Sequence, residues 1–231
     1  MAVVAIHQPE HLPWLGFIDK TRQADTVVLL DHVQFKKNYF ENRNKIRTPT
    51  GWSWLTVPVF IKGKSGQGID EVRIKEESRW REVYLRTLEQ NYRKAPYWKE
   101  YAPYFESLLA RPWEKLVDLN LEIIRFAWNC FGVAPRVVRS SGMTVSGAAT
   151  GLLVEICRAM EATEYLSGPS GRDYLDESLF ADAGIRVRYH KFCHPEYRQA
   201  FAPFVPGLSS LDLLLNAGPG GRDVLAAANP A

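Results

Sequence analysis

The chain has 231 residues, of which 46% are hydrophobic and 12% aromatic, and its formal net charge is +3 at pH 7. This length and apolar content exclude a disordered protein, the small charge does not by itself predict a nucleic-acid partner, and three cysteines are too few for a disulfide framework. Because no apolar run approaches the ~18 residues of a membrane helix and the N-terminus lacks a secretory signal, we expect a cytoplasmic protein with no membrane partner.

Short runs rich in β-branched and aromatic residues alternate with helical patterns along the chain. Strands and helices that alternate in this way are typical of a parallel sheet covered by helices. The sequence therefore predicts a three-layer α/β fold with a mainly parallel sheet, Rossmann-like or nucleotidylyltransferase-like. The predicted strands are VVAI (3–6), TVVLL (26–30), RVVRS (136–140), TEYLS (163–167) and RVRYHK (186–191).

Between Arg47 and Lys75 the pattern changes, because GWSWLTVPVF and VRIK are both extended and a glycine-rich loop separates them. We expect these two segments to form an antiparallel insertion or edge.

The middle of the chain is predicted to be helical. Large apolar residues recur every four residues from Trp80 to Tyr92, and every three or four from Leu116 to Cys130. We interpret the chain as a single α/β domain, 1–231, with a helical insertion at about 76–131. Further helices are predicted at 149–160, at 173–183 and after Ser209, and the chain after Asp223 is expected to fray because it has nothing large to bury.

The most informative polar cluster is HQPEHLPWLG (7–16), which follows the first strand directly. Its two prolines stiffen the loop, and a second strand ends on Asp31. Open α/β sheets bind ligands beyond the carboxyl ends of their strands, so polar groups at both ends predict a site there.

His7 and His11 are spaced like a zinc-binding pair, but such a pair requires a helix and Pro9 lies between them. No metal ligand is therefore predicted. The alternative to a functional role is that both are ordinary loop histidines and that Trp14 is a hydrophobic anchor.

The segment QFKKNYFENRNKIR (34–47) holds five basic residues against a single acid. Arginine and lysine bind phosphate or carboxylate groups, and asparagine offers both a donor and an acceptor. An anionic ligand is the natural partner, although a charge run can also be a solvated face. The residues predicted to bind are Gln34, Lys36, Lys37, Asn42, Arg43 and Asn44.

Two turns rich in small polar residues follow later strands, SSGMTVSGAATG (140–151) and LSGPSGRDYLD (166–176). Such turns expose amides and hydroxyls that can bind a phosphate or a carboxylate. Neither contains a Walker or GxGxxG pattern, and ordinary helix capping by Thr144 or Ser146 explains the first equally well. The residues predicted to contact a ligand are Ser140, Ser141, Ser167, Gly168 and Tyr174.

Several separated segments, in order, resemble the WbqC-like protein family from about Val4 to Gly218. They are IHQPEHLPWLGFIDK, the D-x-V-Q-F-x-K step at Asp31, NRNKIR at Asn42, WLTVPV at Trp54, YLSGPSGRDYLD at Tyr165 and SSLDLLLNAG at Ser209. The resemblance implies a bacterial protein associated with surface-polysaccharide (O-antigen) gene clusters. The implied activity is transfer of glycine or another acyl or aminoacyl group to a sugar. Members of the family often carry an aromatic residue at the position of His11.

A looser resemblance connects the first strand, loop and helix with nucleotidylyltransferases, which hold phosphates with an HxGH loop. The corresponding residues are Gln8, Pro9, Glu10 and His11, so the first histidine and the glycine of that loop are missing. The similarity supports the fold more than the chemistry.

We therefore expect a group transferase that moves a small acyl or aminoacyl group onto a nucleotide-linked amino sugar. His7 or His11 is the expected general base, oriented by Asp31. Gln8, Trp14 and the basic segment would bind the anionic substrate, while the serines and Gly168 would contact the donor or the developing oxyanion.

Two alternatives stay open. One is nucleotidyl transfer by the same pocket, and the other is non-catalytic binding of a nucleotide sugar or a partner protein through residues 34–47. The expected partner is an anionic small molecule of the nucleotide-linked kind. Nucleic acid is expected only as an aminoacyl-tRNA donor, and the sequence does not identify a cofactor.

Overall fold

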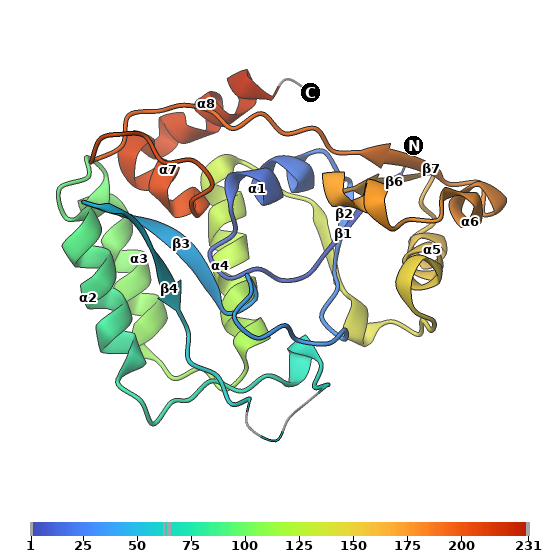
Figure 1. Cartoon of the computed structure of the whole chain (residues 1–231), viewed down its shortest axis with the longest axis horizontal. Helices are drawn as coiled ribbons and strands as arrows, with labels where there is room; N and C mark the ends of the chain where they lie inside the picture. The colour runs from blue at the N-terminus through green and yellow to red at the C-terminus, as the bar shows by residue number, and fades with distance from the viewer. Residues whose placement is uncertain (1, 62, 64–65, 230–231) are drawn as a thin grey trace.

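A computed structural model describes residues 2–61, 63 and 66–229 of the chain. Its centre is a five-stranded sheet in the order β5–β2–β1–β6–β7, in which all neighbouring strands run parallel (Figure 1). The predicted parallel sheet is confirmed. The strands are β1 (Val3–His7), β2 (Thr26–Leu29), β5 (Arg136–Arg139), β6 (Glu164–Ser167) and β7 (Arg186–Tyr189).

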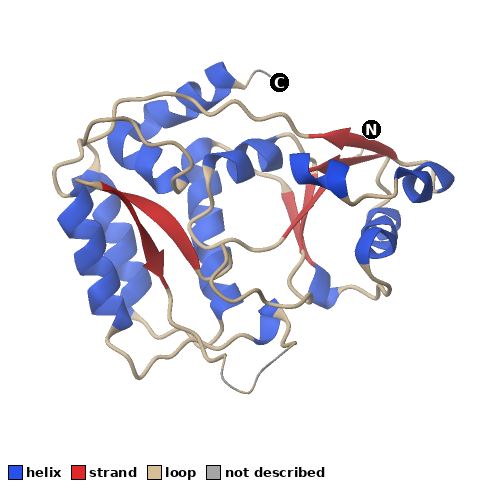
Figure 2. Ribbon diagram, viewed as in Figure 1, coloured by secondary structure: helices blue, strands red, loops and turns tan. Residues whose placement is uncertain are grey.

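Helices cover both faces of this sheet, as Figure 2 shows, so the predicted three-layer α/β fold is also confirmed. Side chains alternate along a strand, so neighbouring residues such as Val4 and Ala5 face opposite layers. Ala5 packs with α1 (Leu15–Arg22) and α4 (Leu116–Phe131), whereas Val4 packs with α5 (Ala149–Ala159) and α6 (Glu177–Asp182).

The long connection from β2 to β5 contains a hairpin and three helices. Figure 1 shows α4 between the sheet and the α2–α3 pair. The predicted helical stretch is confirmed as α2 (Trp80–Tyr92), α3 (Trp98–Ala110) and α4, while the division into a single domain stays a prediction.

The antiparallel edge differs from the prediction in its partner strand. β4 (Gly51–Thr56) pairs with β3 (Arg43–Thr48), a basic run that was not predicted as a strand. The VRIK segment contributes only single antiparallel bridges, one of them between Val59 and Ile74. Lys62 and residues 64–65 of the predicted glycine-rich loop lie outside the described residues.

Two predictions about the C-terminal half were wrong. The helix expected at 173–183 is interrupted: the 3₁₀ helix η3 (Pro169–Asp173) comes first, and α6 begins only after Asp176, whose side chain accepts from the Ser178 N–H and caps it. The chain from Val224 to Ala228 does not fray, because it belongs to α8 (Gly221–Ala228), which buries Leu225.

The remaining short elements are α7 (Ser210–Ala217), η1 (Ile69–Glu71), η2 (Ser140–Gly142) and η4 (Gly218–Gly220). Within the described residues, no helix has both the length and the apolar character that crossing a membrane requires.

Candidate functional site

A cavity of about 710 Å³ lies beyond the carboxyl ends of β1 and β6. In the sheet, β2 is the neighbour of β1 on one side and β6 is its neighbour on the other. The order of strands therefore reverses at β1, beside the cavity. Ligands of open α/β sheets bind at such switch points.

The cavity wall contains some of the predicted binding residues and omits others. The predicted residues in the wall are His7, Gln8, Trp14, Lys36, Gly168 and Tyr174. Those that do not line it are His11, Asp31, Gln34, Lys37, Asn42, Arg43, Asn44, Ser140, Ser141 and Ser167. Sequence reasoning assigned no role to three charged residues of the wall, Glu10, Lys20 and Glu41.

His7 is a neutral imidazole with one free nitrogen. Its Nδ1 lies 2.9 Å from the Gln8 carbonyl oxygen, which can only accept, so Nδ1 carries the proton and Nε2 keeps its lone pair. Nε2 lies 3.7 Å from Oε1 of Glu10, and 27% of the His7 side chain is exposed. Burial and the charge of Lys20 lower the pKa of His7 to about 3, so the ring is uncharged near neutral pH.

Glu10 and Glu41 place buried carboxyl groups in the same wall. Glu10 is 6% exposed and Glu41 is 1% exposed. Among the described residues, Oε2 of Glu10 and both carboxyl oxygens of Glu41 have no hydrogen-bond partner. Burial raises the pKa of Glu10 to about 8 and also raises that of Glu41. Unpaired buried acceptors are unfavourable, so these oxygens are suited to a ligand that donates hydrogen bonds.

Lys20 adds an amine to the wall from α1, a helix buried from Leu15 to Thr21. Its Nζ donates to the Ile6 carbonyl oxygen over 2.9 Å. Burial lowers the pKa of Lys20 to about 8. Its neighbours Asp19, Thr21 and Arg22 are also polar, so the sequence gives no signal that singles out Lys20.

His11 has no free ring nitrogen. Asn120 donates through Nδ2 to the Pro9 and Glu41 carbonyl oxygens, over 3.0 and 2.7 Å, so its Oδ1 accepts from His11 Nδ1, over 2.9 Å. His11 Nε2 is then left to accept the Tyr84 hydroxyl, at 2.8 Å. Burial lowers the pKa of His11 to about 4. This neutral, fully bonded ring is poorly placed to act as a base.

The predicted anion ligands Asn42 and Asn44 also bond to the protein itself. Asn44 donates to the Leu12 and His11 carbonyl oxygens over 2.8 and 3.2 Å, and Asn42 donates to that of Val57 over 3.0 Å. Leu12 has φ of 45°, a left-handed conformation unfavourable for leucine, so its backbone is held by such contacts. Together with Asn120, these asparagines fix the loops that carry Glu10 and Glu41.

Asp31 is bonded to the end of β5 and to neither imidazole. It accepts from Arg139 Nε at 2.6 Å, and from the backbone N–H and hydroxyl of Ser141 at 2.8 and 2.9 Å. Ser140 donates to it over 3.1 Å. Burial acts to raise the pKa of Asp31, but the hydrogen bonds from Arg139 and Ser141 outweigh it and hold the pKa below its usual value. The expected orientation of a histidine by Asp31 is thus absent from its hydrogen bonds within the described part of the chain.

The other predicted residues outside the wall have local partners or face solvent. Gln34 and Lys37 are exposed, and the Arg43 guanidinium lies 4.1 Å from the centre of the Trp54 ring. Ser167 donates to the Gly168 carbonyl oxygen over 3.1 Å. In the same turn, a Cβ on Gly171 would come within 2.1 Å of Ser167 Oγ, so a side chain there would displace the Ser167 hydroxyl.

Among the described residues, no group of three or more His, Cys, Asp or Glu side chains is arranged to hold a metal ion. The family model of the WbqC-like protein family matches residues 8–224 of the chain. The uncharacterized protein Rv1507c of Mycobacterium tuberculosis is 34% identical over 227 residues, which cover 97% of this chain and 98% of the relative. No solved structure matches the chain.

Proposed function

This chain belongs to the WbqC-like protein family, and on that premise we propose that it transfers a small acyl or aminoacyl group onto the amino group of a nucleotide-linked amino sugar, in bacterial surface-polysaccharide biosynthesis. The observation that carries the proposal is the set of unpartnered carboxyl oxygens on Glu10 and Glu41 beside the free Nε2 of His7. These groups together suit an amine substrate.

The two carboxyl groups would bind the amine in its charged form. An ammonium group has three donors and needs acceptors, which the orphan oxygens of Glu10 and Glu41 supply. A nearby cation favours ionised carboxylates, so binding would lower the raised pKa of both groups.

Two proton transfers then accompany acyl transfer. The ammonium first gives a proton to Glu10, which frees the nitrogen lone pair. The nitrogen forms a bond to the acyl carbon, the bond from that carbon to the leaving group breaks with its electron pair, and the second amine proton passes to His7 Nε2. The hydrogen bond from Nδ1 to the Gln8 carbonyl oxygen orients the ring for this step.

The remaining cations would hold negative charge on the two substrates. Lys20 faces the cavity and is mostly protonated below its pKa of about 8, so it can stabilise the developing oxyanion. Lys36 lines the same cavity and can bind an anionic group of the acceptor.

The test is an in vitro reaction with nucleotide-linked amino sugars and a panel of acyl and aminoacyl donors, followed by mass spectrometry. The expected product is heavier than the acceptor by the acyl group and is lost in His7→Ala. Lys37→Ala, which changes an exposed residue outside the wall, is the matched control. Equal product from wild type and His7→Ala would overturn the assignment of the base.

Nucleotidyl transfer is tested in parallel by offering a nucleoside triphosphate and a sugar phosphate. Release of pyrophosphate, without acylated product, would replace the proposed reaction with this one. The bonding of both His11 nitrogens argues against it, because that reaction uses the histidines of its loop to hold phosphates.

A further inference from the structure

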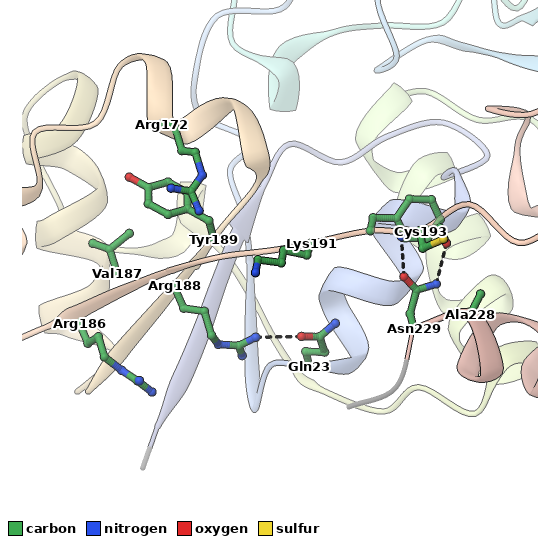
Figure 3. Close-up of a pocket in the computed structure, with 11 residues that line it drawn as sticks. Gln23, Arg172, Arg186, Val187, Arg188, Tyr189, Lys191, Cys193, Ala228 and Asn229 are labelled. Atoms are coloured by element: carbon green, nitrogen blue, oxygen red, sulfur yellow. Dashed lines mark hydrogen bonds between the residues drawn. The ribbon is translucent and has the colours of Figure 1, made fainter.

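A second hollow of about 800 Å³ lies along β7, the strand at the outer edge of the sheet. Figure 3 shows side chains from several elements around it, with Arg172 over the Tyr189 ring and Arg188 bonded to Gln23. We call this hollow the β7 groove. Its wall includes Gln23, Arg172, Arg186, Arg188, Tyr189 and Lys191.

Among the described residues, the wall of the groove contains four cationic side chains and no carboxylate. Arg186 and Arg188 both pair with Glu164, which is only 3% exposed and lies beneath them. One carboxylate balances one of these two charges. Within the described chain, Arg172 and Lys191 form no ion pair. The four cations therefore still outnumber the nearby carboxylates when Glu177, which accepts from the Tyr189 hydroxyl over 2.7 Å, is counted with Glu164.

The guanidinium groups are held in place by protein contacts. Arg188 donates to Gln23 Oε1 over 2.8 Å, and the Arg172 guanidinium lies 4.1 Å from the centre of the Tyr189 ring. Arginine presents a rigid planar fork that matches the oxygens of phosphate, whereas Lys191 is exposed and adds a mobile charge.

We propose that the β7 groove binds a compact polyphosphate group, such as the diphosphate or triphosphate of a nucleotide. Its volume is that of a small-molecule site. A long polynucleotide is less suited, because the net charge of the whole chain is only +3 and Arg172 already covers the Tyr189 face on which a base would stack. This proposal does not depend on the function proposed for the cavity.

A competing explanation is that the charges only protect an exposed edge strand from pairing with other chains. That explanation requires no ligand. It predicts aggregation when the charges are removed and no binding of phosphate compounds by the wild-type protein.

The test is calorimetric titration of the full chain with inorganic pyrophosphate, ATP and a short single-stranded RNA at about 150 mM salt. We expect saturable binding of pyrophosphate and ATP in the groove. Arg172→Gln and Lys191→Gln should each weaken it by about tenfold, equivalent to ~1.4 kcal/mol. Both residues are exposed and outside the ion pairs with Glu164, so the variants should fold.

Two matched variants locate the binding. Arg125→Gln changes an exposed arginine on α4 and should leave the affinity unchanged. Lys36→Gln changes a lysine of the cavity and reports whether the same probes bind there instead. Binding of RNA alone, no binding of pyrophosphate at millimolar concentration, or loss of binding in Lys36→Gln rather than Lys191→Gln would each overturn the proposal.

Discussion

His7 and His11 stand four residues apart in one loop, yet their surroundings are opposite. His7 borders the cavity with a free Nε2, whereas His11 is fully buried and uses both nitrogens in bonds to Asn120 and Tyr84. Both have a lowered pKa because of burial. The difference teaches that a depressed pKa alone does not identify a catalytic histidine, and that the free lone pair facing a cavity is the more telling feature.

The same contrast separates the carboxyl groups. Asp31 is surrounded by donors from Arg139 and Ser141, which lower its pKa. Glu10 and Glu41 have raised pKa values, and three of their carboxyl oxygens have no partner in the described part of the chain. Satisfied polar groups hold the fold together, and unsatisfied ones at a cavity are available to a ligand.

The largest expected effect is that of His7→Ala on catalysis. Loss of a general base should slow acyl transfer by roughly 10²–10⁴-fold. The free energy of unfolding should change by less than about 1 kcal/mol, because the ring is partly exposed. Product formation by mass spectrometry and urea denaturation measure the two. A variant that keeps its activity would remove the proposed difference between the two histidines.

His11→Ala should show the reverse pattern. It leaves Asn120 and Tyr84 without their partner and creates a cavity, so the free energy of unfolding should fall by about 2–4 kcal/mol. Activity per folded molecule should stay within a few-fold of wild type. Urea denaturation and assays below the midpoint of unfolding test this, and a stable but inactive variant would contradict it.

Glu10→Gln should change how stability depends on pH. Burial raises the pKa of Glu10 from 4.5 to about 8, so between these values the folded chain binds more protons at this site than the unfolded chain. The contribution of Glu10 to stability is therefore fully present below about pH 4.5 and is lost as the pH rises towards 8.

Because glutamine does not titrate, the variant should gain stability relative to wild type as the pH increases across this window. Urea denaturation from pH 5 to 8 measures the difference. A difference that is flat with pH, or that runs the other way, would show that Glu10 is ionised in the free protein.

The smallest effects are expected from two neighbouring lysines. Lys36 lines the cavity and Lys37 does not, so Lys36→Ala should raise KM for the acceptor by about threefold to tenfold, which is ~1 kcal/mol, while Lys37→Ala should leave it unchanged. Steady-state kinetics of both variants provide the comparison. Equal changes in KM would show that the basic segment acts through its overall charge.

The sheet and the position of the cavity could be predicted from the sequence because both depend on local patterns. Buried strands appear as apolar runs, and the rule that ligands bind at strand ends places the site next to His7 and Gly168. The direction of each loop side chain could not be predicted. It depends on Asn120, which lies on α4, about a hundred residues further along the chain, and joins Pro9 to Glu41.

Local composition gave wrong expectations of burial and helix formation at residues whose contacts are made with distant parts of the chain. Arg47 belongs to a run that looks solvated, yet it is 1% exposed and donates to carbonyl oxygens of Phe201 and Pro203. The alanine-rich tail stays helical because Leu225 is buried and the Asn229 side chain bonds to the backbone of Cys193. None of these contacts leaves a local signal.

The turn after β6 contributes residues to the walls of both hollows. Residues 168–171 border the cavity on one side, and the next residue, Arg172, borders the β7 groove on the other. A molecule that bound in the β7 groove and displaced this turn would change the shape of the cavity. By thermodynamic reciprocity, a ligand in the cavity would then alter the affinity of the groove. Energetic coupling between the cavity and the β7 groove therefore needs no long chain of intervening contacts, because one tight turn lines both sites.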